Sequence, residues 1–162
     1  MSARHAVGPR WRSVFMTPPR TVLAAPTYAE AAVEARRVMG KGISRQAWAL
    51  APRILEVDQV VQSVDRRILE VHPEVSFVAL AGRYMPTAKS TWAGLEDRRG
   101  LLAAAGFVLP ADLGQPGRVA GSDDVLDAAV ACWTAQRVAG GVSVRCPDPP
   151  EQLDGIAACI HA

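Results

Sequence analysis

Apolar residues recur at helical intervals along most of the chain, and each such stretch has helix-capping or helix-stopping residues at its ends. The helices that this pattern predicts cover residues 27–40, 44–64, 73–82, 90–106 and 122–138. The last is the clearest, because Ser122 can cap it and two acids and an alanine-rich run follow. Pro52 predicts a break within the second helix.

Stretches with the pattern of a β-strand are few and short. Residues 67–72 mix apolar and polar side chains and stop at Pro73, which predicts a strand. A weak strand is predicted at 142–145, and segments rich in proline or glycine predict loops at 109–121 and 147–150. A self-contained α/β domain usually has more strands than this, so we expect part of a sheet to be missing.

The N-terminal stretch is basic, since the first acid in the chain is Glu30. Basic residues without acids suit an organelle transit peptide, but the prolines from Pro9 to Pro26 would break the amphipathic helix that such peptides form. Residues 1–12 are therefore predicted to form an extended basic arm.

Composition narrows the class of protein. The chain has 162 residues, 49% of them hydrophobic, which predicts one domain over 1–162. Its formal charge is only +2, whereas a protein that binds nucleic acid by charge alone has a dense positive surface. Three cysteines without a CxxC pair favour a reducing cytoplasm over a disulfide framework. No apolar run approaches the roughly 18 residues of a membrane span, so no membrane contact is expected.

Acidic residues gather at two predicted element ends. Glu70, His72 and Glu74 surround the end of the predicted strand, and Asp124 and Asp127 follow Asp123 in the first turns of the last predicted helix. Carboxylate oxygens at such positions can converge on Mg²⁺. The same acids can instead stabilise their own helices through the macrodipole, and His72 can be a general base or a hydrogen-bonded structural residue.

Two groups of cations could contact an anionic substrate. Lys41 and Arg45 flank a glycine linker that leads into a helix, and Lys89 precedes Trp92 at another predicted helix start. Backbone N–H groups and positive charge at these positions can bind phosphate. Solvated charges at helix turns explain the same pattern.

Four ordered motifs resemble a bacterial family of unknown function that is described as predicted RNase H-like nucleases. The motifs are residues 40–48 (GKGISRQAW), 70–77 (EVHPEVSF), 89–94 (KSTWAG) and 123–128 (DDVLDA). The resemblance extends from about Gly8 to the C-terminus.

The resemblance implies an α/β RNase H-like fold and a metal-dependent nuclease. It implies that Glu70 is the strand acid, that His72 and Glu74 are its neighbours, and that Asp124 and Asp127 are the helix acids. Catalysis would then fall to these five residues, and Mg²⁺ or Mn²⁺ would be bound by the subset that consists of Glu70, Asp124 and Asp127. Lys41, Arg45 and Lys89 would face the substrate, which is nucleic acid or another phosphate-containing molecule.

The chain departs from the family at its beginning. Members begin with strands that carry an aspartate after a glycine-rich start, and this pattern is absent here. The fold is therefore expected to lack the N-terminal strands, to be helix-rich with a small incomplete sheet, and to be impaired as a nuclease when alone.

Two other functions stay open at this point. A non-catalytic remnant could act as an interaction module or form a homodimer through an exposed sheet edge. A small-molecule phosphohydrolase or nucleotide-binding protein would use the same carboxylates. The nuclease hypothesis predicts that Glu70, Glu74, Asp124 and Asp127 lie close together, with Lys41 and Arg45 on the same side.

Overall fold

The computed structural model describes residues 1–15, 18–64, 68–153 and 156–162. The chain that was expected to form one domain divides into two compact units. The first consists of residues 1–14 and 69–162, and the second of residues 15–68. Each unit has its own hydrophobic cluster, so each is described separately below.

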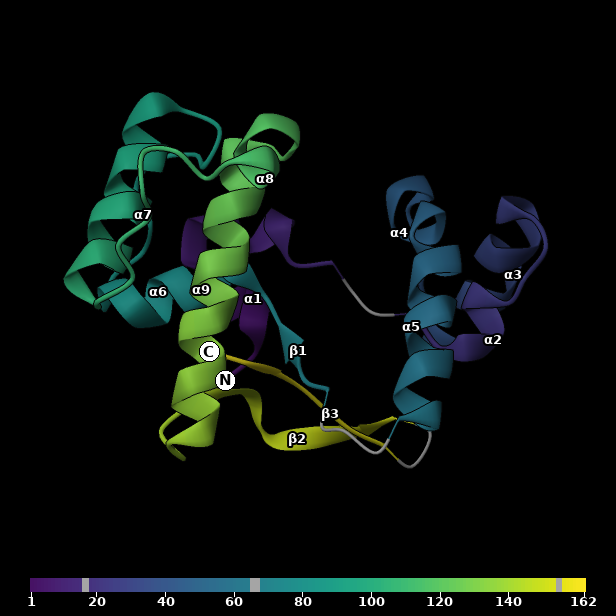
Figure 1. Ribbon diagram of the computed structural model, residues 1–162. Helices are drawn as coiled ribbons and strands as arrows, with labels where there is room; N and C mark the ends of the chain where they lie inside the picture. The colour runs from purple at the N-terminus through teal and green to yellow at the C-terminus, as the bar shows by residue number, and fades with distance from the viewer. Residues whose placement is uncertain (16–17, 65–67, 154–155) are drawn as a thin grey trace. The chain divides into compact units, whose positions relative to one another are not determined.

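A three-stranded mixed sheet belongs to the first unit. Its strands are β1 (Glu70–Val71), β2 (Arg145–Leu153) and β3 (Ile156–His161), in the order β1-β3-β2. β3 runs parallel to β1 and antiparallel to β2, and Figure 1 shows β2 and β3 side by side. The sheet and its helices agree with the expected α/β class, with few strands and many helices. Arg67, where the first strand was predicted to begin, lies outside the described residues.

Three helices enclose the main core of this unit. They are α6 (Pro73–Ala81), α7 (Trp92–Ala104) and α9 (Ser122–Ala139), and all three were predicted from the sequence. Their facing side chains include Phe77, Leu102 and Val130, all fully buried. Burying side chains of this size stabilises a fold by about 1.5–3 kcal/mol each.

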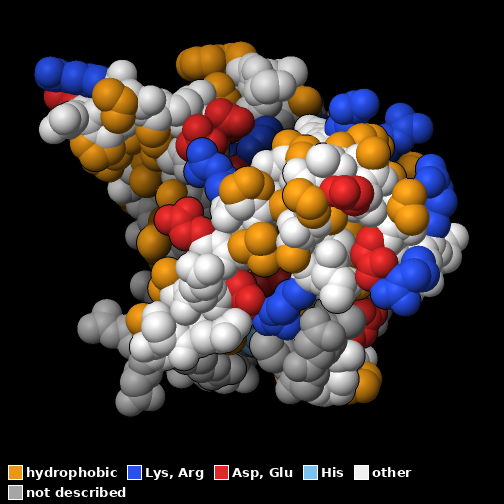
Figure 2. Space-filling view, turned by 90° about the vertical axis from the view of Figure 1, so that its right-hand side faces the viewer, with side chains coloured by type: hydrophobic (Ala, Val, Ile, Leu, Met, Phe, Trp, Pro, Cys, Tyr) orange, Lys and Arg blue, Asp and Glu red, His pale blue; other side chains and the backbone are white. Residues whose placement is uncertain are grey.

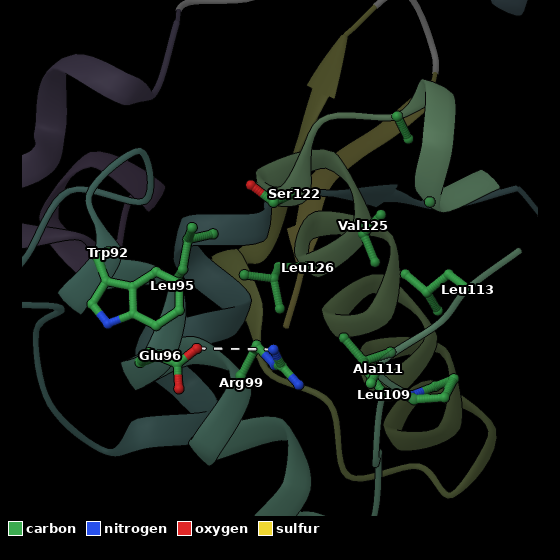
Figure 3. Close-up of a pocket in the computed structure, with 13 residues that line it drawn as sticks. Trp92, Leu95, Glu96, Arg99, Leu109, Ala111, Leu113, Ser122, Val125 and Leu126 are labelled. Carbon is green, nitrogen blue, oxygen red and sulfur yellow. Dashed lines mark ion pairs between the residues drawn. The ribbon is translucent and has the colours of Figure 1, made fainter. Parts of the chain in front are cut away.

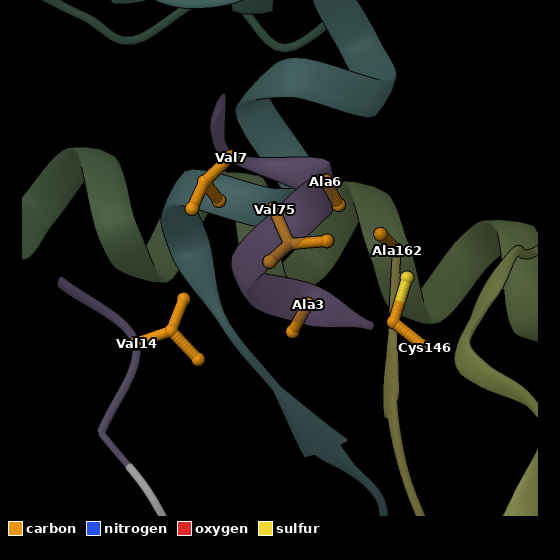
Figure 4. Close-up of a cluster of buried hydrophobic side chains, with 7 residues drawn as sticks. All are labelled: Ala3, Ala6, Val7, Val14, Val75, Cys146 and Ala162. Carbon is orange, nitrogen blue, oxygen red and sulfur yellow. The ribbon is translucent and has the colours of Figure 1, made fainter. Parts of the chain in front are cut away.

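The N-terminal residues are helical, in contrast to the predicted extended arm. Helix α1 (Ala3–Ala6) is followed by a 3₁₀ helix, η1 (Gly8–Ser13). Val7 and the alanines of α1 pack with Val75 of α6 and Cys146 of β2 in the cluster drawn in Figure 4. Burial of these small apolar residues favours the helical turn, and the basic side chains of Arg4 and Arg12 remain exposed.

The second unit, residues 15–68, is helical. Its helices are α2 (Arg20–Leu23), α3 (Tyr28–Met39), α4 (Arg45–Ala49) and α5 (Ala51–Ser63). Thr27 and Glu30 form a capping box at the start of α3, and Gly40 ends α3 with a φ of 67°, a left-handed conformation that glycine adopts at little cost. The predicted break near Pro52 is confirmed, because α4 ends and α5 begins around Leu50.

Two predicted loops contain regular structure. Helix α8 (Gln115–Val119) occupies part of the stretch 109–121, with Pro116 in its first turn, where no N–H is needed. Strand β2 passes through the predicted loop at 147–150. The register of β2 against β3 shifts between Cys146 and Glu151, so the prolines fall where the ladder is interrupted.

The start of α9 differs from the prediction by one residue. Ser122 is not the cap, since it is the first residue of α9 and Gly121 holds the N-cap position.

The described helices include none that is both long enough and apolar enough to cross a membrane. Figure 2 shows acidic and basic side chains interspersed on the face in view. This distribution agrees with a formal charge of only +2.

Candidate functional site

Glu74 lies in the first turn of α6, as its sequence position predicted, but its carboxylate faces the protein interior. Its Oε1 accepts a hydrogen bond of 2.8 Å from Nη2 of Arg98, a residue of α7 that has no exposed surface. The Arg98 guanidinium also donates from Nη1 to the carbonyl oxygens of Gly94 (3.0 Å) and Thr87 (3.3 Å), and it lies 5.2 Å from the ring centroid of Phe77. Glu74 is therefore the counter-ion of a buried arginine.

Gly94 is essential to this arrangement. A Cβ atom at residue 94 would stand 1.8 Å from the carbonyl oxygen of Ala88, which is far inside van der Waals contact. Thr91 caps α7 by accepting a hydrogen bond from the Gly94 N–H at 3.1 Å. The segment that precedes α7 thus packs directly on the first turn of the helix that carries Arg98.

His72 holds the N-cap position of α6 and makes a structural contact. Its Nε2 lies 3.0 Å from the carbonyl oxygen of Ser13. A carbonyl only accepts, so Nε2 is the ring nitrogen that donates, and Nδ1 takes no part in this contact. That Nδ1 is buried and has no hydrogen-bond partner in the part of the chain that the structure describes. These contacts favour the structural role of His72 over the role of general base.

Glu70 belongs to β1 and is paired in the sheet with Ile160 of β3. The residue is exposed, but the protein atoms around its carboxyl raise the pKa of Glu70 by desolvation, and nearby His72 partly offsets this rise. Glu70 keeps the access to solvent that a metal ligand needs.

Lys89 lies between two carboxylates of α9. Its Nζ is 2.6 Å from Oδ2 of Asp127 and 3.3 Å from Oδ2 of Asp123. Desolvation lowers the pKa of Lys89, but the hydrogen bonds and charges of Asp127 and Asp123 outweigh it, so the net pKa is raised. The ammonium group therefore stays charged and offsets one of the two negative charges of these acids.

Asp124 is the exposed acid at the start of α9. Its Oδ2 and the Oδ1 of Asp123 lie close to Gly121, because a Cβ atom at that glycine would meet them at 3.1 and 2.9 Å. Both carboxylates therefore fold back toward the N-terminus of α9, where a negative charge is favourable.

The predicted metal ligands are not gathered into one cluster. Within residues 1–15, 18–64, 68–153 and 156–162, no group of three or more His, Cys, Asp or Glu side chains is arranged to hold a metal ion. The acids are instead distributed: Glu74 pairs with Arg98, and Asp127 pairs with Lys89. Of the four acids that were expected to converge, Glu74 and Asp127 are thus held in separate ion pairs.

The predicted phosphate-binding cations belong to different units. Lys41 and Arg45 lie in the unit of residues 15–68, and Lys89 lies in the other. Lys41 is exposed after Gly40, and the Arg45 guanidinium lies 4.5 Å from the ring centroid of Tyr28. The short helix α4 is already capped by Ser44, whose Oγ accepts from the Ala47 N–H at 3.0 Å. Arg45 is therefore held by an aromatic ring of its own unit.

A pocket of about 230 Å³ between α7, the 109–120 segment and α9 was not predicted from the sequence. Figure 3 shows Trp92, Leu95 and Arg99 of α7 on one side and Val125 and Leu126 of α9 on the other. The lining is mostly apolar, and its charged members, Glu96 and Arg99, form an ion pair at 3.9 Å. The spacing of Trp92, Leu95 and Arg99 was the available signal, because residues i, i+3 and i+7 share one helix face.

The comparisons with known proteins identify a family. A family model described as "Protein of unknown function (DUF429)" matches residues 1–152. No curated protein and no solved structure matches the chain significantly.

Proposed function

This chain belongs to the DUF429 family, and we propose that it carries an RNase H-like site for metal-dependent hydrolysis of phosphodiesters that is impaired in the isolated chain. The residues that we assign to the metal are Glu70, Asp124 and Asp127. The proposal rests on the resemblance of four sequence motifs, on an α/β fold with acids at β1 and α9, and on the contacts that those acids make.

The observation that carries the proposed impairment is the position of Lys89 between Asp123 and Asp127. Carboxylate oxygens are the donors that Mg²⁺ and Mn²⁺ prefer, so the residue types fit such an ion. Their arrangement does not fit it, because the Lys89 ammonium engages oxygens that a divalent cation would need. A metal ion at such a site would activate water and neutralise phosphate charge, and the isolated chain is expected to lack this chemistry.

Glu74 is excluded from the proposed ligand set by its own contacts. Its carboxylate pairs with Arg98, which is fully buried. If Glu74 turned away to bind a metal ion, the charge of Arg98 would stay buried without a partner, which costs about 3–5 kcal/mol. His72 is likewise assigned to positioning, since it links β1 to the end of η1.

The proposal is tested by cleavage of single-stranded and double-stranded DNA and RNA in the presence of Mn²⁺. The wild-type chain is expected to cleave no faster than the double variant Glu70→Gln, Asp124→Asn. Lys89→Met frees Asp123 and Asp127 and is expected to gain cleavage that the further change Asp124→Asn removes. Absence of cleavage by Lys89→Met would contradict the hydrolase function.

A second candidate function, an interaction module, is favoured by a row of exposed apolar side chains. These lie on and next to α5, within the unit of residues 15–68: Leu50, Val57, Val60, Val61 and Val64. An apolar helix face of this kind is typical of a surface that another protein covers.

The expected homodimer through the sheet edge is less well supported than the α5 face. Strand β1 has only two residues, and β2 includes Pro147, Pro149 and Pro150, which have no N–H to donate. Sedimentation of the full chain separates these surfaces: Val57→Lys with Val61→Lys should abolish self-association through α5 and leave self-association through the sheet edge intact.

A further inference from the structure

Cys159 and His161 form a pair on β3 that the proposed hydrolase does not use. Side chains two residues apart on a strand point to the same face of the sheet. The Sγ of Cys159 lies 3.5 Å from Nε2 of His161, and Nδ1 of the same ring lies 3.4 Å from Oγ of Ser143. The imidazole is therefore held between a thiol and a hydroxyl.

The pair lies on the sheet face opposite the cluster of buried side chains drawn in Figure 4. Ile160 and Ala162, which alternate with it along the chain, pack in the cluster that contains Cys146. His161 is only 5% exposed, whereas Cys159 is half-buried, so Cys159 is the more accessible residue of the two. Cys159 also lies along the part of β3 where the register with β2 shifts between Cys146 and Glu151.

The other two thiols have different surroundings. Cys132 is exposed on α9, and Cys146 is 4% exposed within the core cluster. Burial raises the pKa of the Cys146 thiol, which disfavours its reactive thiolate form. A neighbouring histidine instead favours the reactive thiolate form, because an imidazolium stabilises its negative charge.

We propose that Cys159 is the reactive thiol of this chain and a site of oxidation by hydroperoxides, with His161 as the group that takes its proton. The thiolate sulfur attacks one oxygen of the peroxide and forms an S–O bond while the O–O bond breaks. The departing oxygen takes the proton from His161 and leaves as water or an alcohol. Sulfur is oxidised by two electrons to the sulfenic acid, and the peroxide is reduced by the same two electrons.

The charged groups on the neighbouring strands bear on the pH dependence of this reaction. On β2, Arg145 is in register with His161 and pairs with Asp148 at 2.8 Å. On β1, Val71 is in register with His161, and Glu70 is in register with Ile160 and so belongs to the other face. The Cys146 thiol of β2 also interacts electrostatically with Cys159, and His161 is the ring in contact with the Cys159 thiol.

The test is the alkylation rate of each cysteine in the full chain from pH 5.5 to 9, with iodoacetamide as the probe and mass spectrometry of the peptides as the readout. Cys159 is expected to react at least about tenfold faster than Cys132 near pH 6.5, because a neighbouring imidazolium favours the reactive thiolate. His161→Gln should remove the low-pH part of this profile and leave the rate of Cys132 unchanged. Treatment with hydrogen peroxide followed by dimedone should label Cys159 and not the Cys159→Ser variant.

The comparison of Cys159 with Cys132 requires no substitution, so it stands even if His161→Gln fails to fold. Equal rates for the two cysteines at every pH would overturn the proposal. So would an unchanged pH profile in a folded His161→Gln variant, or dimedone labelling confined to Cys132.

Discussion

Arg98 of α7 donates a 2.8 Å hydrogen bond to Glu74 of α6 in the interior of the first unit, although 24 residues separate them in the sequence. Arg98 is fully buried and Glu74 nearly so. The pair joins two of the three helices around the main core, and it assigns a structural role to an acid that the sequence grouped with the catalytic ones.

Loss of one partner of this pair should destabilise the fold strongly. Arg98→Ala is expected to lower the free energy of unfolding by about 3–5 kcal/mol, because Glu74 would remain buried and charged without a partner. Urea unfolding followed by circular dichroism measures this change. The control is Arg83→Ala, which breaks the half-exposed pair with Asp97 and should cost no more than about 1 kcal/mol. Similar losses in the two variants would contradict a special role for the buried pair.

Two glycines of α7 provide a matched test of the packing next to Arg98. Gly94→Ala places a Cβ atom 1.8 Å from the Ala88 carbonyl oxygen, so it should lower the free energy of unfolding by about 1–3 kcal/mol. Gly100→Ala meets nothing within 4 Å and should raise it by about 0.5–1 kcal/mol through helix propensity. Thermal unfolding of both variants should give changes of opposite sign. If Gly94→Ala were more stable than wild type, the Ala88 carbonyl could not lie as close to residue 94 as described.

The raised pKa of Glu70 predicts a pH-dependent effect of Glu70→Gln. A carboxyl whose pKa is higher in the folded state than in the unfolded state binds its proton more tightly when folded. Its contribution to stability is full at pH values below the unfolded pKa and is lost as the pH rises through the folded pKa. At pH 7 the ionised carboxylate is therefore unfavourable, and removing its charge should stabilise the chain.

Denaturant unfolding of wild type and Glu70→Gln at pH 7 and near pH 4 checks this sign. The gain in midpoint at pH 7 should shrink at the lower pH, where most of the Glu70 carboxyl is protonated in wild type. A gain that is equal at both pH values would have a cause other than titration of Glu70.

Local sequence signals predicted the helices well and the pairing of charges poorly. The helices predicted at 27–40, 73–82 and 90–106 depend on neighbours within a few residues, and all three are present. Which cation meets which acid depends on tertiary packing: Lys89 and Asp127 are 38 residues apart. The sequence therefore identified both residues as functional candidates and could not predict that they neutralise each other.

Strand β2 was missed for a related reason. Its prolines are typical of a loop, and only the register shift opposite β3 explains how a strand accommodates them. The helical N-terminus was missed because its stability comes from burial against α6 and β2 and not from its own sequence.

The most direct test of the account is the calorimetric titration of Mn²⁺ into wild type and Lys89→Met, with Lys41→Met as the charge-matched control in the other unit. If Lys89 occupies the carboxylates that a divalent cation would need, Lys89→Met should bind Mn²⁺ at least about tenfold more tightly than wild type, which corresponds to about 1.4 kcal/mol. Lys41→Met should bind as wild type does, and adding Asp124→Asn to Lys89→Met should reverse the gain. Binding by Lys89→Met that is no tighter than wild type would contradict a metal site at Glu70, Asp124 and Asp127.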